Sequence, residues 1–196
     1  DTQRVRLYGD INHQVRGCRR LSVLGAVFDS SCDFVDLLVT DTTVFVAHGL
    51  SPARDMCRFV ELCAGISCSG VGLSAAGFEH IGSVEWRPPL AQLHAACHPG
   101  IPVITGDINE PSCIRDVLQK FQPPFSLMSG ISCQPYSSGG SQGGSEDIRS
   151  NTLPATVRLC YLCQSPLLII ECVTQARSNR FVRSILQALE NQLDRK

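Results

Sequence analysis

Lysine is nearly absent from this chain, which carries it only at positions 120 and 196. The positive charge is therefore almost all arginine, and 17 basic residues against 18 acidic ones leave a net charge of −1. This balance neither indicates nor excludes nucleic-acid binding, because phosphate contacts need only a locally basic surface. Five arginines cluster near the start, and we interpret them as a solvated surface rather than a phosphate-binding groove: Arg4, Arg6, Arg16, Arg19 and Arg20.

Long apolar runs are also absent. The longest, residues 165–170, has the length of a strand, whereas a membrane-spanning helix needs about 20 apolar residues. The chain begins with Asp1 rather than Met, and no apolar signal region follows. We therefore expect an intracellular protein, nuclear in a eukaryote, and a fragment of a longer polypeptide.

Cysteine, in contrast, is abundant, with eleven residues. That number would indicate disulfides in a secreted chain, but nothing here indicates secretion. A structural zinc site needs two close pairs of ligands on turns that converge. Cys63 and Cys68 fall at a predicted strand end and in the loop after it, whereas Cys160 and Cys163 fall in a predicted helix. We therefore predict reduced, mostly buried thiols and no metal site.

Residues 57–193 alternate between short β-rich runs and longer helical stretches. Strands that alternate with helices imply right-handed crossovers and a parallel sheet covered on both faces. The predicted fold class is therefore α/β, with a doubly wound, mostly parallel sheet. The predicted strands are 58–62, 81–85, 101–104, 125–128 and 167–173. The predicted helices reach to about 77, open at Pro88, and cover about 112–121, 152–163 and 181–193.

Residues 1–56 do not share this alternation. Strands are predicted at 21–28, 34–39 and 43–46, separated by turns rich in Asp, Ser and Thr. This N-terminal extension is a small β-rich appendage, the end of a preceding domain, or a set of additional strands on the sheet. The sequence alone leaves these three alternatives open.

Two features at the predicted strand ends indicate a nucleoside, because an open α/β sheet binds its ligands there. The first is the glycine-containing turn within residues 61–72, where small residues let a ligand approach the backbone. The second is an acid at the end of each of the next two strands, Glu85 and Asp107. Glu85 is placed to accept both hydroxyls of a ribose, and Trp86 beside it to stack on an adenine. Either acid alone would be explained by a helix cap or a surface charge.

The third feature is Cys133, which lies on a glycine- and serine-rich loop, residues 129–145, after the fourth predicted strand. Glu171 ends the apolar fifth strand at the adjacent edge of the sheet. A carboxylate at the end of so apolar a strand needs a hydrogen-bonded role. We interpret the two as a nucleophile and its acid partner; the alternatives are an ordinary loop thiol and a carboxylate that caps the following helix.

Four blocks of the sequence resemble, in the same order, the motifs of the C5-cytosine-specific DNA methyltransferase family: residues 58–86, 130–140, 147–153 and 171–173. Their common order makes the resemblance specific. It implies that residues 57–196 are an incomplete methyltransferase catalytic domain of Rossmann-like fold. It also implies S-adenosyl-L-methionine as the cofactor and DNA as the partner, with RNA as the alternative substrate.

The resemblance further implies roles for individual residues. Cys133 would attack C6 of a cytosine flipped out of the duplex, and Glu171 would hold its N3/N4 edge and supply a proton. Glu85 would bind the ribose of the methyl donor, and Asp107 the amino group of its adenine. The implied cofactor-binding residues are Cys63, Gly65, Ile66, Glu85, Trp86, Asp107, Ile108 and Leu153.

The chain also departs from the family pattern. Ser132 stands in place of the proline before the nucleophile, Cys172 replaces an asparagine, and Ser67 and Cys68 replace glycines of the donor-binding turn. The later family blocks, target recognition among them, do not follow, although residues 4–9 faintly resemble the Arg-x-Arg block. We therefore expect a second segment or subunit to supply target recognition. An inactive or regulatory binding module stays open as an alternative function.

Overall fold

The structure is a computed structural model that describes residues 58–193 except Ser141, with side chains up to residue 189. In the N-terminal part it describes only the backbone of five strands. These are β1 (Gln3–Arg6), β2 (Ser22–Val23), β3 (Ala26–Val27), β4 (Asp36–Val39) and β5 (Thr42–His48).

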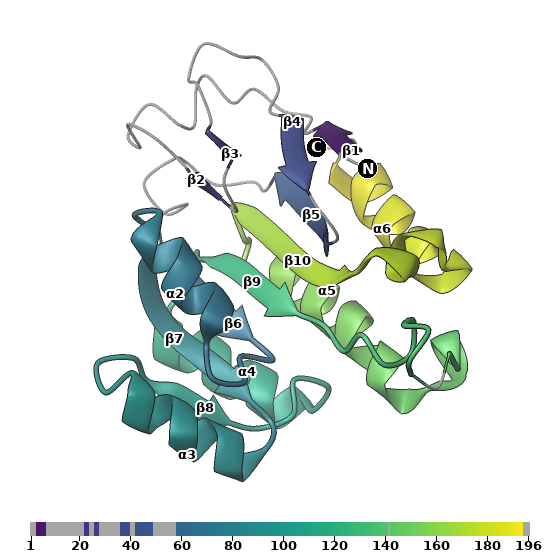
Figure 1. The fold of residues 1–196 in the computed structure, drawn as a ribbon. Helices are drawn as coiled ribbons and strands as arrows, with labels where there is room; N and C mark the ends of the chain where they lie inside the picture. Colours follow the sequence, from purple (N-terminus) through teal and green to yellow (C-terminus); the bar gives the residue numbers. More distant parts are fainter. Residues whose placement is uncertain are drawn as a thin grey trace.

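A six-stranded sheet in the order β5-β10-β9-β6-β7-β8 forms the centre of the fold (Figure 1). The chain places β7 and β8 on one side of β6 and then returns to place β9 and β10 on the other, so the order reverses between β6 and β9. An open α/β sheet binds ligands at the carboxyl ends of its strands near such a reversal. The five parallel strands are β6 (Arg58–Leu62), β7 (Glu79–Glu85), β8 (Val103–Thr105), β9 (Ser126–Gly130) and β10 (Leu167–Val173).

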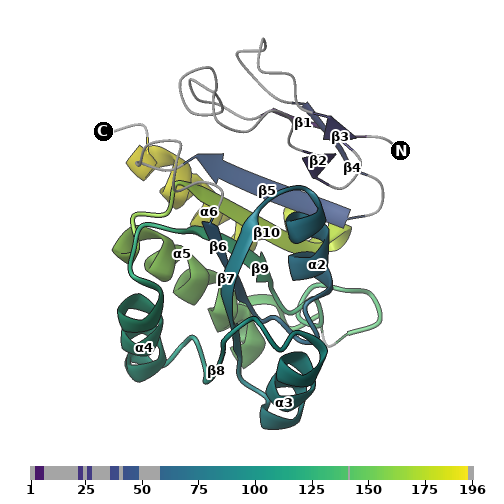
Figure 2. The same cartoon turned by 90° about the vertical axis from the view of Figure 1, so that its left-hand side faces the viewer.

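Helices cover both faces of the sheet. Figure 2 shows α2 and α3 on one face and α4, α5 and α6 on the opposite face. Among the residues that the structure describes, no helix combines the length and the apolar character needed to span a bilayer. The helices are α2 (Cys68–Ala75), α3 (Pro88–Cys97), α4 (Pro111–Phe121), α5 (Thr152–Leu162) and α6 (Arg180–Leu193).

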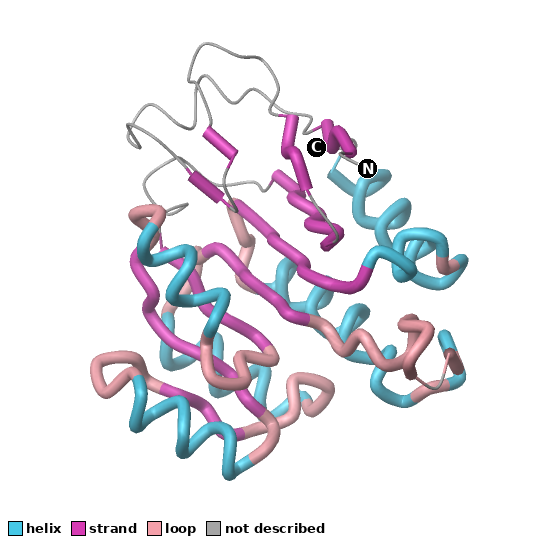
Figure 3. The backbone as a smooth tube through the Cα atoms, in the orientation of Figure 1, coloured by secondary structure: helices cyan, strands magenta, loops and turns pink. Residues whose placement is uncertain are grey.

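The alternation predicted from the sequence is confirmed over residues 58–193, with boundaries that differ by a few residues. Pro88 and Pro111 occupy the first turns of α3 and α4, where the missing N–H of proline carries no penalty. Three short helical turns, coloured as helix in Figure 3, interrupt the segments after β9 and β10. They are η1 (Gly144–Glu146), η2 (Ile148–Asn151) and η3 (Thr174–Ser178).

One of the five N-terminal strands lies on the central sheet, whereas the other four form two separate two-stranded sheets. Strand β5 pairs antiparallel with β10 over its whole length and so extends the sheet. The predicted strand 21–28 is instead the antiparallel pair β2–β3, and β1, which pairs with β4, was not predicted. The division of the chain at residue 57 into an extension and a catalytic domain stays a prediction.

The middle of the sheet is buried from both sides, and β10 is accordingly a nearly continuous apolar run. Val60, Leu62, Leu127, Leu168 and Ile170 are almost fully buried in one core cluster. Glu61, in β6, is equally buried although its side chain is carboxylic. A buried carboxyl group needs hydrogen-bond partners, and those of Glu61 lie in the turn that follows β6.

Candidate functional site

The turn between β6 and α2 has an unusual backbone. Cys63, Gly65 and Ser67 adopt φ values of 55°, 54° and 66°. Side chains disfavour this left-handed region, so Cys63 and Ser67 are held there by their surroundings. A Cβ at Gly65 would meet nothing within 4 Å. The turn therefore leaves its backbone open on that side, where a ligand can approach it.

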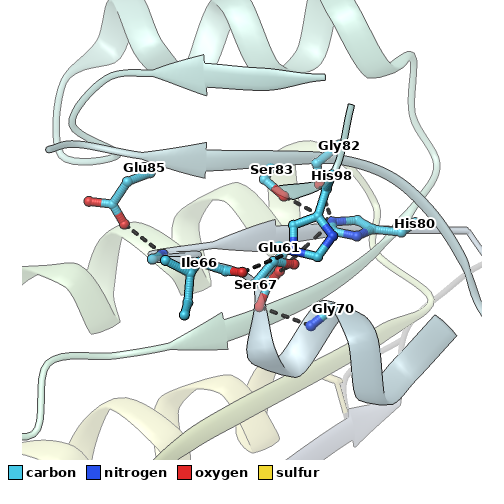
Figure 4. A network of polar contacts seen from close by, with 10 residues as sticks. Glu61, Ile66, Ser67, Gly70, His80, Gly82, Ser83, Glu85 and His98 are labelled. Carbon is cyan, nitrogen blue, oxygen red and sulfur yellow. Dashed lines mark hydrogen bonds and ion pairs between the residues drawn. The ribbon is translucent and has the colours of Figure 1, made fainter. Parts of the chain in front are cut away.

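Glu85, at the end of β7, stabilises this turn by a hydrogen bond. Its Oε2 accepts a hydrogen bond from the Gly65 N–H in the turn at 2.8 Å (Figure 4). Its Oε1 accepts one from the Arg87 N–H at 2.9 Å. Glu85 is only 3% exposed. Because a carboxylate offers about four lone-pair sites, two such contacts leave acceptor capacity for ligand hydroxyls.

Two large apolar side chains are exposed beside the turn. Trp86 is 63% exposed and Ile66 is 46% exposed. Asp107, after β8, is exposed as well, and its Oδ1 accepts hydrogen bonds from both nitrogens of Asn109. Burial raises the pKa of the Cys63 thiol to about 12, and the charges of Glu85 and Asp107 add to the shift, so these groups share one neighbourhood. Apolar surface next to carboxylates suits a nucleoside.

Ile108 and Leu153, which the sequence also assigned to the cofactor, are buried. Ile108 is 4% exposed, Leu153 is 1% exposed, and both belong to the hydrophobic core. Their role against a ligand stays a prediction.

Cys133 lies exposed on the loop after β9. Its carbonyl oxygen accepts hydrogen bonds from the N–H groups of Tyr136 and Ser137, at 2.9 and 2.8 Å, which closes a tight turn behind the thiol. A Cβ at Gly140 would lie 2.0 Å from the Gln134 carbonyl oxygen, so only glycine fits there. The loop is thus packed backbone to backbone directly beside Cys133.

Arg149, in the segment that follows this loop, forms hydrogen bonds that connect the two. Its Nε donates to Asp147 Oδ1 at 2.8 Å, and its backbone N–H donates to the same oxygen at 3.0 Å. Its Nη1 donates to Gln134 Oε1. Arg149 therefore links the residue next to Cys133 to the start of η2.

Glu171 reaches the same edge of the sheet. A Cβ at Gly130 would lie 3.7 Å from Glu171 Oε2 and 4.0 Å from the Cys63 carbonyl oxygen. Burial raises the pKa of Glu171. Burial also raises the pKa of Cys172 to about 12, and the charges of Glu171 and Cys133 add to that shift. Glu171 thus lies at the point where the loop of Cys133 begins, next to the turn between β6 and α2.

Sequence reasoning gave no role to Glu61, although an acid inside an apolar strand is a signal. Its Oε2 accepts the Ser67 hydroxyl at 2.5 Å and its Oε1 accepts the Gly70 N–H at 3.1 Å. Helix α2 has no capping side chain at Ser67 and no acid in its first turn. Glu61 therefore caps α2 from the neighbouring strand, and burial raises its pKa.

Sequence reasoning also missed three histidines behind the turn. His80 stacks on Phe59 with 4.5 Å between ring centroids, and its Nε2 lies 2.9 Å from Ser83 Oγ. Burial, and then His94, lower the pKa of His80 to about 4. His94 is fully buried; burial and His98 lower its pKa, and the Gly65 backbone opposes that shift. His98 Nε2 lies 3.0 Å from the Ile66 carbonyl oxygen.

In the part of the chain that the structure describes, no group of three or more His, Cys, Asp or Glu residues is arranged to hold a metal ion. Cys160 and Cys163 are buried at the end of α5, and burial raises the pKa of both thiols. Protonated, buried thiols are poor ligands and poor nucleophiles.

Comparison with known sequences relates this chain to one family of proteins. A family model described as C-5 cytosine-specific DNA methylase matches residues 57–194. The type II methyltransferase M.NaeI of Lentzea aerocolonigenes is 32% identical over 122 residues, which are 62% of this chain and 29% of that protein. The type II methyltransferase M.NgoMIV of Neisseria gonorrhoeae is 29% identical over 114 residues, 58% of this chain and 35% of that protein. The matches thus span about a third of these relatives.

Solved structures resemble the chain in fold. The S. pombe Dnmt2 methyltransferase superposes with a TM-score of 0.53 at 17% identity, covering 69% of this chain and 41% of that one. A mutant of Spodoptera frugiperda DNMT2 superposes with a TM-score of 0.53 at 16% identity, covering 68% and 40%. The predicted Rossmann-like α/β fold is confirmed by these likenesses.

Proposed function

The chain belongs to the C-5 cytosine-specific DNA methylase family, and from this premise we propose that it forms the donor-binding and catalytic part of a DNA methyltransferase. The reaction would move a methyl group from S-adenosyl-L-methionine to C5 of cytosine. Because the matches span about a third of the curated relatives, we propose that a further segment or subunit completes target recognition.

One observation carries this proposal. Gly130, the last residue of β9, has two polar neighbours: a Cβ built on it would lie 3.7 Å from Glu171 Oε2 and 4.0 Å from the Cys63 carbonyl oxygen. Cys133 follows three residues later on the same loop. The Glu171 carboxylate and the turn that holds Cys63 thus both border the end of β9, so the acid side and the donor side of the site lie next to each other, as methyl transfer between two bound molecules requires.

The donor side fits S-adenosyl-L-methionine. Gly65 leaves the turn open, Glu85 retains lone pairs for ribose hydroxyls, and Trp86 and Ile66 offer exposed apolar surface for the adenine and the methionine chain. Asp107 would accept a hydrogen bond from the adenine amino group. When bound, the sulfonium group supplies an electrophilic methyl; the protein residues hold and orient it.

On the acid side, the Cys133 thiolate would form a bond to C6 of the cytosine, and Glu171 would give a proton to N3, which draws electrons from C6. The raised pKa of Glu171 favours the protonated carboxyl group that this step needs. C5 then takes the methyl group, with release of S-adenosylhomocysteine. A base removes the C5 proton, the electrons of that C–H bond re-form the C5–C6 double bond and expel the Cys133 thiolate, and N3 returns its proton to Glu171.

The donor half is tested by calorimetric titration of the chain with S-adenosylhomocysteine, beside a Glu85→Ala variant. We expect the wild type to bind and the variant to lose about tenfold or more in affinity, because it loses the ribose contact and the tie to Gly65. A Glu79→Ala variant is the matched control, since Glu79 is an exposed acid at the other end of β7. Equal affinity of all three would refute the assignment of Glu85.

The catalytic half is tested by trapping on DNA that contains 5-fluorocytosine, in the presence of the methyl donor. Fluorine at C5 cannot leave as a proton does, so a live Cys133 stays covalently attached after methyl transfer. We expect an adduct with the wild type and with Cys97→Ala, an exposed cysteine on α3, but not with Cys133→Ala. A donor-binding protein that gives no adduct even with its target-recognition part present would instead be a binding module, and an adduct on RNA alone would indicate the RNA enzyme.

A further inference from the structure

The Ile66 carbonyl is held from outside the turn. His98 Nε2 lies 3.0 Å from this oxygen, across 32 positions of sequence (Figure 4). A carbonyl oxygen only accepts hydrogen bonds, so Nε2 is the donor. The neutral tautomer with the proton on Nε2 and the imidazolium both supply that proton, and the contact therefore persists in either charge state.

The turn is fixed from its other sides by different groups. The Ala64 N–H donates to the Val84 carbonyl at 3.1 Å, Glu85 accepts from Gly65, and Glu61 accepts from Ser67. These contacts come from β6 and β7. Ile66 is the residue of the turn that projects its side chain outward, and the contact on its carbonyl comes from the end of α3.

His98 is itself well anchored. It caps α3, where its N–H donates to the His94 carbonyl at 2.8 Å and its own carbonyl accepts from Ile101 at 2.9 Å. Its ring packs edge-on against the fully buried ring of His94, with 5.1 Å between centroids, and His94 packs in the same way on His80 at 6.2 Å. The row of three rings gives His98 a rigid base.

We propose that His98 is a positioning residue for methyl-donor binding, which acts by holding the Ile66 carbonyl and with it the open face of the Gly65–Ile66 backbone. This inference rests on the proposed donor site. His98 does not touch the donor itself. It keeps the left-handed conformations on both sides of Ile66 from relaxing, so that the turn is already in its binding shape before the donor arrives.

The test compares the wild type with His98→Ala, His98→Gln and a control, Gln92→Ala, which changes an exposed residue of the same helix. Titration with S-adenosylhomocysteine measures affinity for the donor product. Amide hydrogen exchange measures how well the backbone amides of residues 64–67 are protected from solvent. We expect His98→Ala to weaken binding about tenfold and to speed exchange in the turn by a similar factor, as the loss of one hydrogen bond implies. His98→Gln, whose amide nitrogen can donate to the same carbonyl, should recover most of both losses, and Gln92→Ala should change neither.

The outcomes separate the two proposals. A wild type that does not bind S-adenosylhomocysteine refutes the donor site and, with it, the role of His98 in donor binding. Donor binding and turn exchange that are unchanged in His98→Ala refute the positioning role alone. If His98→Ala speeds exchange throughout α3 and β7 and His98→Gln restores nothing, His98 supports the fold in general and the proposal is also overturned.

Discussion

Replacing Glu61 by alanine should destabilise the protein at the base of the donor turn. The substitution removes the acceptor for the Ser67 hydroxyl and for the Gly70 N–H, and it leaves the first turn of α2 without a cap. Hydrogen bonds to a carboxylate contribute roughly 1.5–3 kcal/mol each, and these two bonds are themselves the cap of α2. The variant no longer has to bury a carboxyl group, and this gain offsets part of the loss. We therefore expect a net cost of about 3 kcal/mol, which corresponds to a fall in Tm of roughly 6–12 °C for a domain of this size.

Urea denaturation followed by circular dichroism measures this cost, with an unchanged m value as the check that the folded state is intact. Glu61→Gln keeps the shape and one acceptor oxygen, so it should cost about 1 kcal/mol. Glu79→Ala, an exposed acid on the next strand, should cost nothing measurable. A cost below about 1 kcal/mol for Glu61→Ala, or equal costs for Ala and Gln, would refute the capping role.

The difference in stability between the wild type and Glu61→Gln should depend on pH. Because burial raises the pKa of Glu61 above its ordinary 4.5, the folded state binds the proton more tightly than the unfolded state. The stability that protonated Glu61 contributes is fully present below pH 4.5 and is lost as the pH rises through the folded pKa. The stability advantage of the wild type over Glu61→Gln should therefore shrink from pH 4 to pH 8, and an advantage that grows would contradict this sign.

Three further predictions concern the rest of the site. Glu171→Gln should slow adduct formation on fluorocytosine DNA by about 10²–10⁴-fold, and only the wild type should lose rate as the pH rises through the raised pKa of Glu171. Gly140→Ala puts a Cβ 2.0 Å from the Gln134 carbonyl, so the loop has to move by more than an ångström; adduct formation should fall by about 100-fold while the far-UV spectrum is unchanged. The pKa of His80 falls from 6.5 to about 4, so its neutral form contributes stability that is present above pH 6.5 and lost towards pH 4; the wild type should lose roughly 3 kcal/mol more over that range than His80→Phe, measured by urea titration.

Much of the fold followed from local pattern. The apolar runs and the helical stretches between them predicted a parallel sheet, since consecutive parallel strands need crossovers that a helix provides. The same pattern put Glu85 and Glu171 at the ends of strands, and Gly65 and Cys133 in the loops that follow strands. Because the carboxyl ends of parallel strands share one edge of the sheet, these residues had to lie on that edge whatever the details of packing.

The tertiary structure decided which groups touch. The pairing of β5 with β10, the contact of Glu61 with Ser67 and Gly70, and the hold of His98 on Ile66 join segments whose sequences carry no sign of each other. Periodicity records which face of an element is buried, but hydrogen bonds depend on distances of a few tenths of an ångström between side chains. Local sequence thus determined the edge on which the site lies, and only the packing of β6, β7 and α3 determined how its donor turn is held.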